Sequence, residues 1–287
     1  MDPSGALRDF LLSRRARLRP DDVGLSGHGP RRVAGLRREE VAELAAVSLE
    51  HYIRLERGHA SQVSDAVLDA VADALRLSPG ERRYLHSLAR PPAGHEKTSR
   101  AGVRPSVQHV LDSMIDTPAY LVGPGGTVLA WNRLASAVFA DFSRIPAGQR
   151  TVGRLVFTHP RARRLYADWE AKAREAVSYL RTETGKRPHD PALADEIRQL
   201  TARSEDFRRL WSEQLVLETT HSTVRLICPP FGRLELSWET LRLTDSPDEV
   251  VLVYTAAPGS PSAEALRTLS RAAGITPAPA DRRPRGC

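Results

Sequence analysis

Apolar residues in the first 90 positions recur three and four residues apart, the spacing of one face of an α-helix. This spacing predicts helices over residues 6–18, 64–76 and 78–89. Ser64 and Ser78 stand where a helix N-cap is expected, and Pro79 occupies a first helical position, where its missing N–H does no harm. Residues 19–35 form a long loop rich in Gly, Pro and Asp. We therefore expect an all-α N-terminal region.

Residues 36–58 carry two shorter helical patterns joined by a turn of small residues. The inward-facing positions are Val41, Leu44 and Ala45 on the first helix and Tyr52 and Leu55 on the second. Ala45 and Ala46 allow close approach of the helices, Ser48 suits the N-cap of the second helix, and Gly58 suits its end. The pattern predicts a helix-turn-helix; an ordinary packed helical hairpin is the alternative.

Beyond residue 104 the pattern becomes a mixture of helical and alternating segments. Two β-rich runs around Gly123–Gly126 predict a hairpin over 118–132, after which Asn132 opens a short helix. Further helical patterns cover residues 105–116, 158–187, 191–212 and 262–272. Alternating apolar positions predict strands over residues 215–220, 223–229, 232–243 and 249–257.

These patterns predict two domains. The first, residues 1–90, is an all-α helix-turn-helix domain of five helices, and the second, residues 104–273, is an α+β domain with an antiparallel sheet. Residues 91–103 have the composition of a linker, with Pro, Gly and charges but no apolar period. The Pro- and Arg-rich tail, residues 274–287, is expected to be disordered.

Composition narrows the possible functions only moderately. The net charge of +7 suggests a nucleic-acid partner, but residues 1–100 hold only +3 of it, so individual arginines are better evidence than the total. Two cysteines are too few for a disulfide framework, and neither a secretory signal nor a membrane span is visible. We expect a cytoplasmic protein. The histidines show no metal-binding spacing, so we expect no metal and no cofactor.

The turn, the serine cap and the Glu-Arg-Gly ending of residues 36–58 closely resemble the DNA-binding core of phage-repressor-like (XRE-type) regulators. The matching residues are Arg38, Glu39, Glu40, Val41, Ala42, Val47, Ser48, Tyr52, Leu55, Glu56 and Gly58. The resemblance implies a repressor-like fold whose second helix lies in the major groove of DNA. It also suggests that Arg14 or Arg15 pairs with Glu56.

The DNA contacts follow from that resemblance. Arg54 can bond a guanine bidentately, Glu50 can accept from a cytosine amine, and Leu49 can pack on a thymine methyl. Arg37 and Arg57 are phosphate candidates, and the loop pair Arg31 and Arg32 is expected at the backbone or a minor groove. The full expected set is Arg31, Arg32, Arg37, Arg38, Ser48, Leu49, Glu50, His51, Arg54 and Arg57. For each residue, an ordinary solvated side chain is the alternative.

The second domain resembles the C-terminal ligand-binding domain of MmyB-like regulators, and its hairpin passing into a helix at Asn132 is typical of PAS-like sensor domains. The matching stretches are residues 117–135, 159–181, 203–211, 238–241 and 253–269. The resemblance implies a small apolar ligand such as a fatty acid. Aromatic residues that recur beside aliphatic ones are candidates for the pocket, and a place in the ordinary hydrophobic core is the alternative for each: Trp131, Phe139, Trp169, Trp211 and Trp238. The chain departs from the family at Ser212–Gln214 and Cys228–Pro230, where the family has histidines.

The predicted function is a ligand-responsive transcriptional regulator, binding a palindromic DNA operator as a homodimer. One helix-turn-helix buries too little surface for high specificity alone, which favours the dimer. An antitoxin or protein-interaction module using the same helix-turn-helix is the alternative. No nucleotide-binding or nucleophile motif supports an enzyme.

Overall fold

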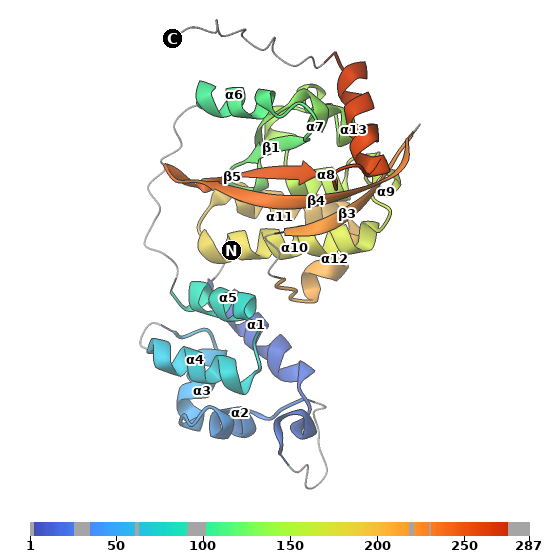
Figure 1. The fold of residues 1–287 in the computed structure, drawn as a ribbon. Coiled ribbons are helices and arrows are strands. Elements are labelled where there is room, and N and C mark those ends of the chain that lie inside the picture. Colours follow the sequence, from blue (N-terminus) through green and yellow to red (C-terminus); the bar gives the residue numbers. More distant parts are fainter. Residues whose placement is uncertain are drawn as a thin grey trace, which may run out of the picture. The chain divides into compact units, whose positions relative to one another are not determined.

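The computed structural model describes residues 3–25, 35–60, 63–90, 102–217, 221–229 and 231–274. Arg31, Arg32, most of the predicted linker and the predicted tail lie outside these residues. The chain forms two compact units (Figure 1). Unit 1 contains Met1–Glu96 and Arg174–Glu218, and unit 2 contains Lys97–Ala173 and Thr219–Cys287.

The N-terminal part of unit 1 contains the five predicted α-helices. They are α1 (Pro3–Arg17), α2 (Arg38–Leu44), α3 (Leu49–Glu56), α4 (Asp65–Ala74) and α5 (Pro79–Ala89), with a 3-10 helix, η1 (Pro20–Val23), after α1. Ser64 and Ser78 cap α4 and α5 as expected, since each hydroxyl accepts a backbone N–H three residues on. The helices bury one apolar core that includes Leu7, Phe10, Leu36, Val41, Tyr52, Leu55, Leu68 and Leu85.

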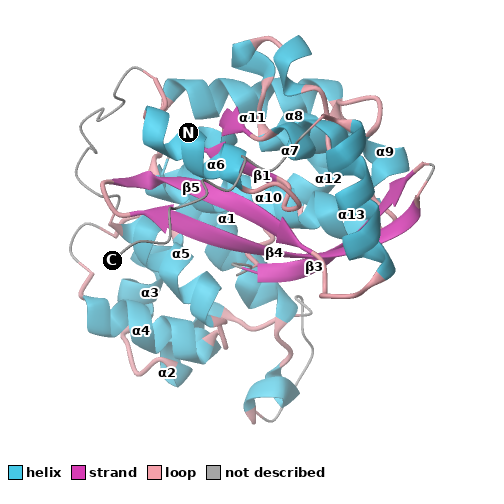
Figure 2. Cartoon of the chain, turned by 45° about the horizontal axis from the view of Figure 1, so that its top comes forward, coloured by secondary structure: helices cyan, strands magenta, loops and turns pink. Residues whose placement is uncertain are grey.

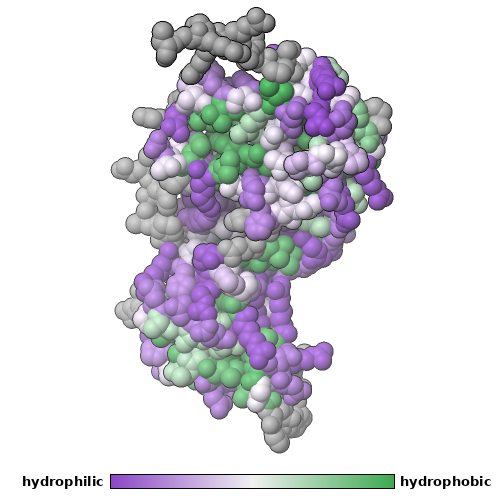
Figure 3. Space-filling model, viewed as in Figure 1, coloured by the Kyte–Doolittle hydropathy of each residue, from purple (hydrophilic) through white to green (hydrophobic). Residues whose placement is uncertain are grey.

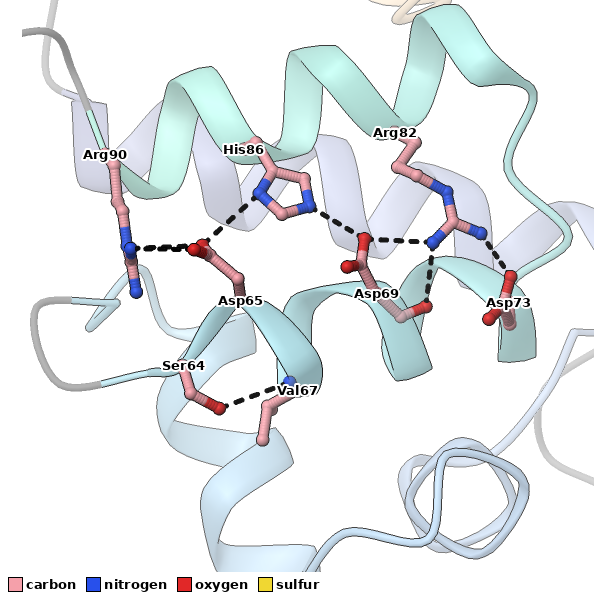
Figure 4. A network of polar contacts seen from close by, with 8 residues as sticks. All are labelled: Ser64, Asp65, Val67, Asp69, Asp73, Arg82, His86 and Arg90. Carbon is pink, nitrogen blue, oxygen red and sulfur yellow. Dashed lines mark hydrogen bonds and ion pairs between the residues drawn. The ribbon is translucent and has the colours of Figure 1, made fainter.

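A row of charged side chains joins α4 to α5 at the surface (Figure 4). His86 Nε2 lies 3.0 Å from Asp69 Oδ1, and Arg82 donates to the same oxygen at 2.9 Å. Arg82 also contacts Asp73, and Arg90 donates to Asp65 at 3.1 Å. These pairs hold the two helices in register on their solvent side.

Unit 1 also contains most of α10 (Trp169–Lys186), together with α11 (Pro191–Arg203) and α12 (Glu205–Ser212). The single helix predicted over 191–212 is wrong, because the chain leaves helical geometry at Ser204, whose hydroxyl caps α12 by accepting Phe207 N–H at 3.1 Å. The helix predicted over 158–187 is also interrupted. Tyr166 separates α9 (Ala162–Leu165) from α10, because its extended backbone forms a β-bridge with Leu226.

Unit 2 is built on a five-stranded antiparallel sheet of order β2-β1-β5-β4-β3. The strands are β1 (Ala119–Val122), β2 (Val128–Trp131), β3 (His221–Cys228), β4 (Gly232–Leu243) and β5 (Ser246–Thr255). The predicted hairpin is confirmed, with Tyr120 opposite Trp131. The strand predicted over 215–220 is wrong for 215–217, which form no ladder, and the remainder lies outside the described residues.

Helices cover the sheet of unit 2. α6 (Pro105–Ser113) packs Val107 and Leu111 against Ala119, Leu121 and Val251. α13 (Pro261–Ala272) crosses β4, as Figure 2 shows. α7 (Arg133–Val138) begins at Asn132, as expected, and α8 (Val152–Phe157) was not predicted. Together they complete the α+β architecture.

The surface of both units is mixed in polarity, and apolar residues reach it in several places (Figure 3). Among the described residues, the large apolar side chains that stay exposed are Leu49, Val110, Leu217, Ile227 and Leu241. Of these exposed apolar residues, Leu49 lies on α3, the second helix of the helix-turn-helix.

Candidate nucleic-acid interface and ligand cavity

The turn between α2 and α3 is tight because its backbone turns at a single left-handed residue. Ala46 has a φ of 52°, an uncommon conformation for a residue with a Cβ. Val47 N–H then reaches back to Ala42 C=O at 3.0 Å, and Ser48 Oγ accepts His51 N–H at 3.2 Å. These bonds fix where α3 begins, and so which residues stand at its N-terminal end.

The side chains of α3 divide into a buried and an exposed face. Tyr52, Leu55 and Glu56 are each about 1% exposed. All six residues of the expected DNA-contacting set in this region are exposed: Ser48, Leu49, Glu50, His51, Arg54 and Arg57. Leu49, an apolar residue, is 43% exposed beside these polar groups. The sequence pattern therefore placed the two faces of α3 correctly.

The C-terminal end of α3 is held by a buried carboxylate between two arginines. Arg15 Nε donates to Glu56 Oε1 at 2.7 Å, and Arg38 Nε contacts Glu56 Oε2. Tyr52 OH donates to the same carboxylate at 3.4 Å, and burial together with the Glu56 charge raises the pKa of Tyr52. Arg15 is thus the partner that the repressor resemblance suggested. The joint role of Arg38 and Tyr52 was not foreseen.

Arg38 and Arg37 lie at the start of α2. Arg38 keeps 46% of its side chain exposed although it is paired with Glu56. The backbone N–H of Arg37 donates to the Glu40 carboxylate at 2.7 Å, which caps α2. Both arginines therefore stand at the N-terminal end of α2, where the amide dipoles favour an anion.

Gly58 ends α3 and brings it against α1. Its φ is 90°, and a Cβ added there would lie 2.3 Å from the carbonyl oxygen of Ser4. A side chain fits neither the backbone angle nor the space. Gly58 therefore allows the chain at the end of α3 to approach α1, the helix that carries Arg15.

Unit 2 encloses a small cavity between the sheet and its helices. Its walls are aliphatic side chains of α8 and α9 together with Tyr120, Phe139, Phe142, His159, Tyr166 and Lys172. The space open to a water-sized sphere is about 20 Å³, room for only one or two water molecules. Any larger ligand must displace some of these side chains.

The cavity wall includes Lys172, which is only 8% exposed. Its Nζ lies 5.5 Å from the Trp238 ring centroid and 6.0 Å from that of Tyr166. Trp238 is buried, and its indole N–H finds no acceptor among the described residues. Burial and the nearby Arg161 lower the pKa of His159, which favours its neutral form. The wall of the cavity thus places an ammonium group near an aromatic ring.

Of the pocket residues expected from the sequence, Phe139 lines the cavity. The four tryptophans do not. Trp131 packs on Phe142, Trp169 donates its indole N–H to Val156 C=O at 3.0 Å, and Trp238 lies beside Lys172. Trp211 belongs to unit 1, where it stacks on Phe207. Lys172 and His159 were missed because single polar residues in a helical segment carry no sequence signal.

In the described part of the chain, no group of three or more His, Cys, Asp or Glu side chains is placed to hold a metal.

Each of the two sites lies in a part of the chain that matches a known protein family. Residues 7–85 match the helix-turn-helix domain family, and residues 103–269 match the MmyB-like transcription regulator ligand binding domain. A comparison with curated proteins finds no match. The fold and the two sites define a helix-turn-helix, DNA-binding transcription regulator with a ligand-binding domain. The second match covers more than half of the chain, which therefore belongs to the family of MmyB-like transcription regulators. None of its described helices is both long enough and apolar enough to cross a bilayer.

Proposed function

We propose that this protein reads its operator through the N-terminal half of α3 and that an apolar ligand with an anionic end controls its binding. The observation that supports operator reading by α3 is the exposed face of this helix. Ser48, Glu50 and Arg54 offer donors and acceptors on a helix whose buried face is fixed by the Glu56 carboxylate. Side chains of this kind on a rigid helix suit the base edges of the major groove.

The operator-binding form is a homodimer that works in the cytoplasm, where the chromosome lies. A single module of this size buries too little DNA surface for high specificity, so two copies on a palindrome are required. The half-sites would be centred about 10 base pairs, one helical turn, apart.

Selection of duplexes from a random library by the full-length protein tests this part. We expect the selected sequences to share an inverted repeat, and sedimentation of the complex to give two chains for each duplex. Selection that returns no common sequence would show that α3 does not read bases. A selected sequence with a single half-site, bound by one chain, would contradict the proposed homodimer.

The cavity of unit 2 supports the second half of the proposal. Aromatic and aliphatic walls suit an apolar body, while the Lys172 ammonium suits a carboxylate. Fatty acids, the ligand class suggested by the family resemblance, have both parts. Because the cavity holds only about 20 Å³ of free space, their binding would have to displace side chains of the wall, which include those of α8 and α9. Such a movement is a means of signalling.

Calorimetric titration with dodecanoic acid, compared with dodecan-1-ol, tests the ligand class. We expect the acid to bind more tightly, and Lys172→Met to weaken it about tenfold, the worth of one charge-assisted hydrogen bond. Lys186→Met is the matched control, since Lys186 lies on the same helix but outside the cavity lining, where it pairs with Glu183 at 3.1 Å. Equal binding of acid and alcohol, or an equal effect of both variants, would refute the carboxylate assignment.

A further inference from the structure

Residues 174–217 belong by sequence to the ligand-binding family match, yet they pack with the DNA-binding helices in unit 1. Val216 shows this directly. It is only 7% exposed and is part of the hydrophobic core formed by α1 to α5. Its neighbour Leu217 is 47% exposed. We call residues 213–217, which follow α12, the docking turn.

Two arginines of α1 hold the docking turn. Arg17 donates to Glu213 C=O at 2.7 Å, and Arg14 donates to Gln214 C=O. Arg14 is only 3% exposed, and its guanidinium lies 4.6 Å from the Phe10 ring centroid. Its pKa is lowered to about 10, mainly by burial. Carbonyls at the end of a helix lack internal partners and carry partial negative charge, so these cations satisfy them.

The docking turn is also held from α10. Arg181, 3% exposed, donates to Gln214 Oε1 at 2.6 Å and to Trp211 C=O. Ser178 donates to Leu217 C=O at 3.1 Å. α10 is the helix that also carries Lys172, a residue of the ligand cavity. One helix therefore links the cavity to the docking turn through the covalent chain.

α10 and α5 approach so closely that no side chain fits between them at one position. A Cβ added to Gly185 would lie 2.6 Å from Ser87 Oγ and 2.7 Å from the Tyr84 ring. Tyr84 is itself buried, so it has little room to move. A larger residue at this position would therefore push α10 away from α5.

α1 carries the Arg15–Glu56 bond next to the arginines that hold the docking turn. Arg15 also donates to Leu36 C=O at 2.6 Å, just before α2. We propose that the docking turn is the element through which the ligand-binding part of the chain sets α1, and through Arg15 and Glu56 the position of α3. This inference rests on the proposed function, because it assigns the route by which ligand binding would alter DNA affinity.

Hydrogen exchange of the full-length protein, without ligand or DNA, tests the docking. Two variants disturb it in different ways: Arg17→Ala removes a donor to the turn, and Gly185→Leu separates α10 from α5. We expect α3 amides to exchange about fivefold faster or more in both, the size of an ordinary coupling. The matched controls are Arg8→Ala, which removes another exposed arginine of α1, and Gly148→Leu, where an added Cβ meets nothing within 4 Å.

Unchanged α3 exchange in both test variants, or equal acceleration in the controls, would overturn the inference. Arg17 is 45% exposed, so its replacement leaves the buried core intact and gives a result even if Gly185→Leu fails to fold.

A second arm uses the duplex obtained by selection. Coupling is reciprocal, so DNA should slow exchange of residues 213–217 in the wild type, and this protection should be lost in Arg17→Ala. Failure to bind any duplex refutes the proposed function. Binding without protection at 213–217 refutes the docking turn alone.

Discussion

At the scale of single residues, Glu56 connects the DNA-binding surface to the rest of unit 1. Its carboxylate is 1% exposed and meets Arg15, Arg38 and Tyr52. Removing one member of a buried pair leaves the other charge without compensation, which costs more than the pair contributes. Glu56 is therefore a positioning residue for α3 and makes no contact with DNA bases in this account.

Replacement of Glu56 by alanine should lower the free energy of unfolding by about 3 kcal/mol, because Arg15 would remain largely buried without its carboxylate. Urea unfolding of the full-length protein measures this. Glu50→Ala, an exposed acidic residue on the same helix, should change stability by less than about 0.5 kcal/mol. Similar losses in the two variants would argue against a stabilising role for the buried Glu56 carboxylate.

Arg54 and Arg57 should differ in what they read. Arg54→Ala should cost about 1–3 kcal/mol of operator affinity and relax preference at one base pair. Arg57→Ala should weaken all sequences uniformly and reduce the salt slope by about one. Titration of both variants against the selected operator and its single-base variants separates these outcomes. A uniform loss for Arg54→Ala would make it a phosphate contact.

At the scale of elements, the α2–α3 turn contains a residue under conformational strain. Ala46 adopts a φ of 52° and is exposed, so its methyl group costs about 1 kcal/mol there without packing gain. Ala46→Gly should raise the free energy of unfolding by about that amount. Ala45→Gly, at a φ of −83° in the buried helix end, should lower it. Thermal unfolding measures both, and the same sign for the two changes would contradict the strain.

The polar contacts between α4 and α5 should make the stability of the protein depend on pH in the acid range. Hydrogen bonds from His86 and Arg82 lower the pKa of Asp69 in the folded protein. The folded state therefore holds its proton less tightly than the unfolded state, so this stabilisation is present at neutral pH and is lost below about pH 4. Asp69→Asn should be less stable at neutral pH and lose less on acidification, whereas Asp112→Asn should follow the wild type. Parallel urea midpoints for all three between neutral and acid pH would disprove this contribution.

Sequence patterns located helices and strands well where nearby residues determine the backbone conformation. Ser48, Ser64 and Asn132 each mark a helix start that the structure contains. The patterns failed where contact with a distant segment of the chain determines the conformation. Tyr166 leaves the helical conformation to pair with Leu226 in the sheet, a contact that no periodicity near residue 166 reveals. Likewise, residues 215–217 have the apolar content of a strand but serve as the docking turn.

At the scale of the whole molecule, the expected domain plan and the compact units differ in one segment. Residues 174–218 lie within the predicted second domain in sequence, yet they belong to the same compact unit as the first domain. The buried arginines that hold this segment, Arg14 and Arg181, look from the sequence like solvated charges. A ligand pocket in this domain was expected, but most of its lining residues were equally hard to foresee, since Lys172 lies on a helix far along the chain from Tyr120 and Phe139.

If ligand binding in the cavity controls the DNA-reading helix α3, a bound ligand must change the affinity of the protein for its operator. The dissociation constant of the full-length protein for its selected operator, measured with and without saturating dodecanoic acid, tests it most directly. We predict a change of about fivefold or more in the wild type, reduced at the same acid concentration by Lys172→Met. An operator affinity that stays the same while calorimetry shows the acid bound to the protein would contradict the account.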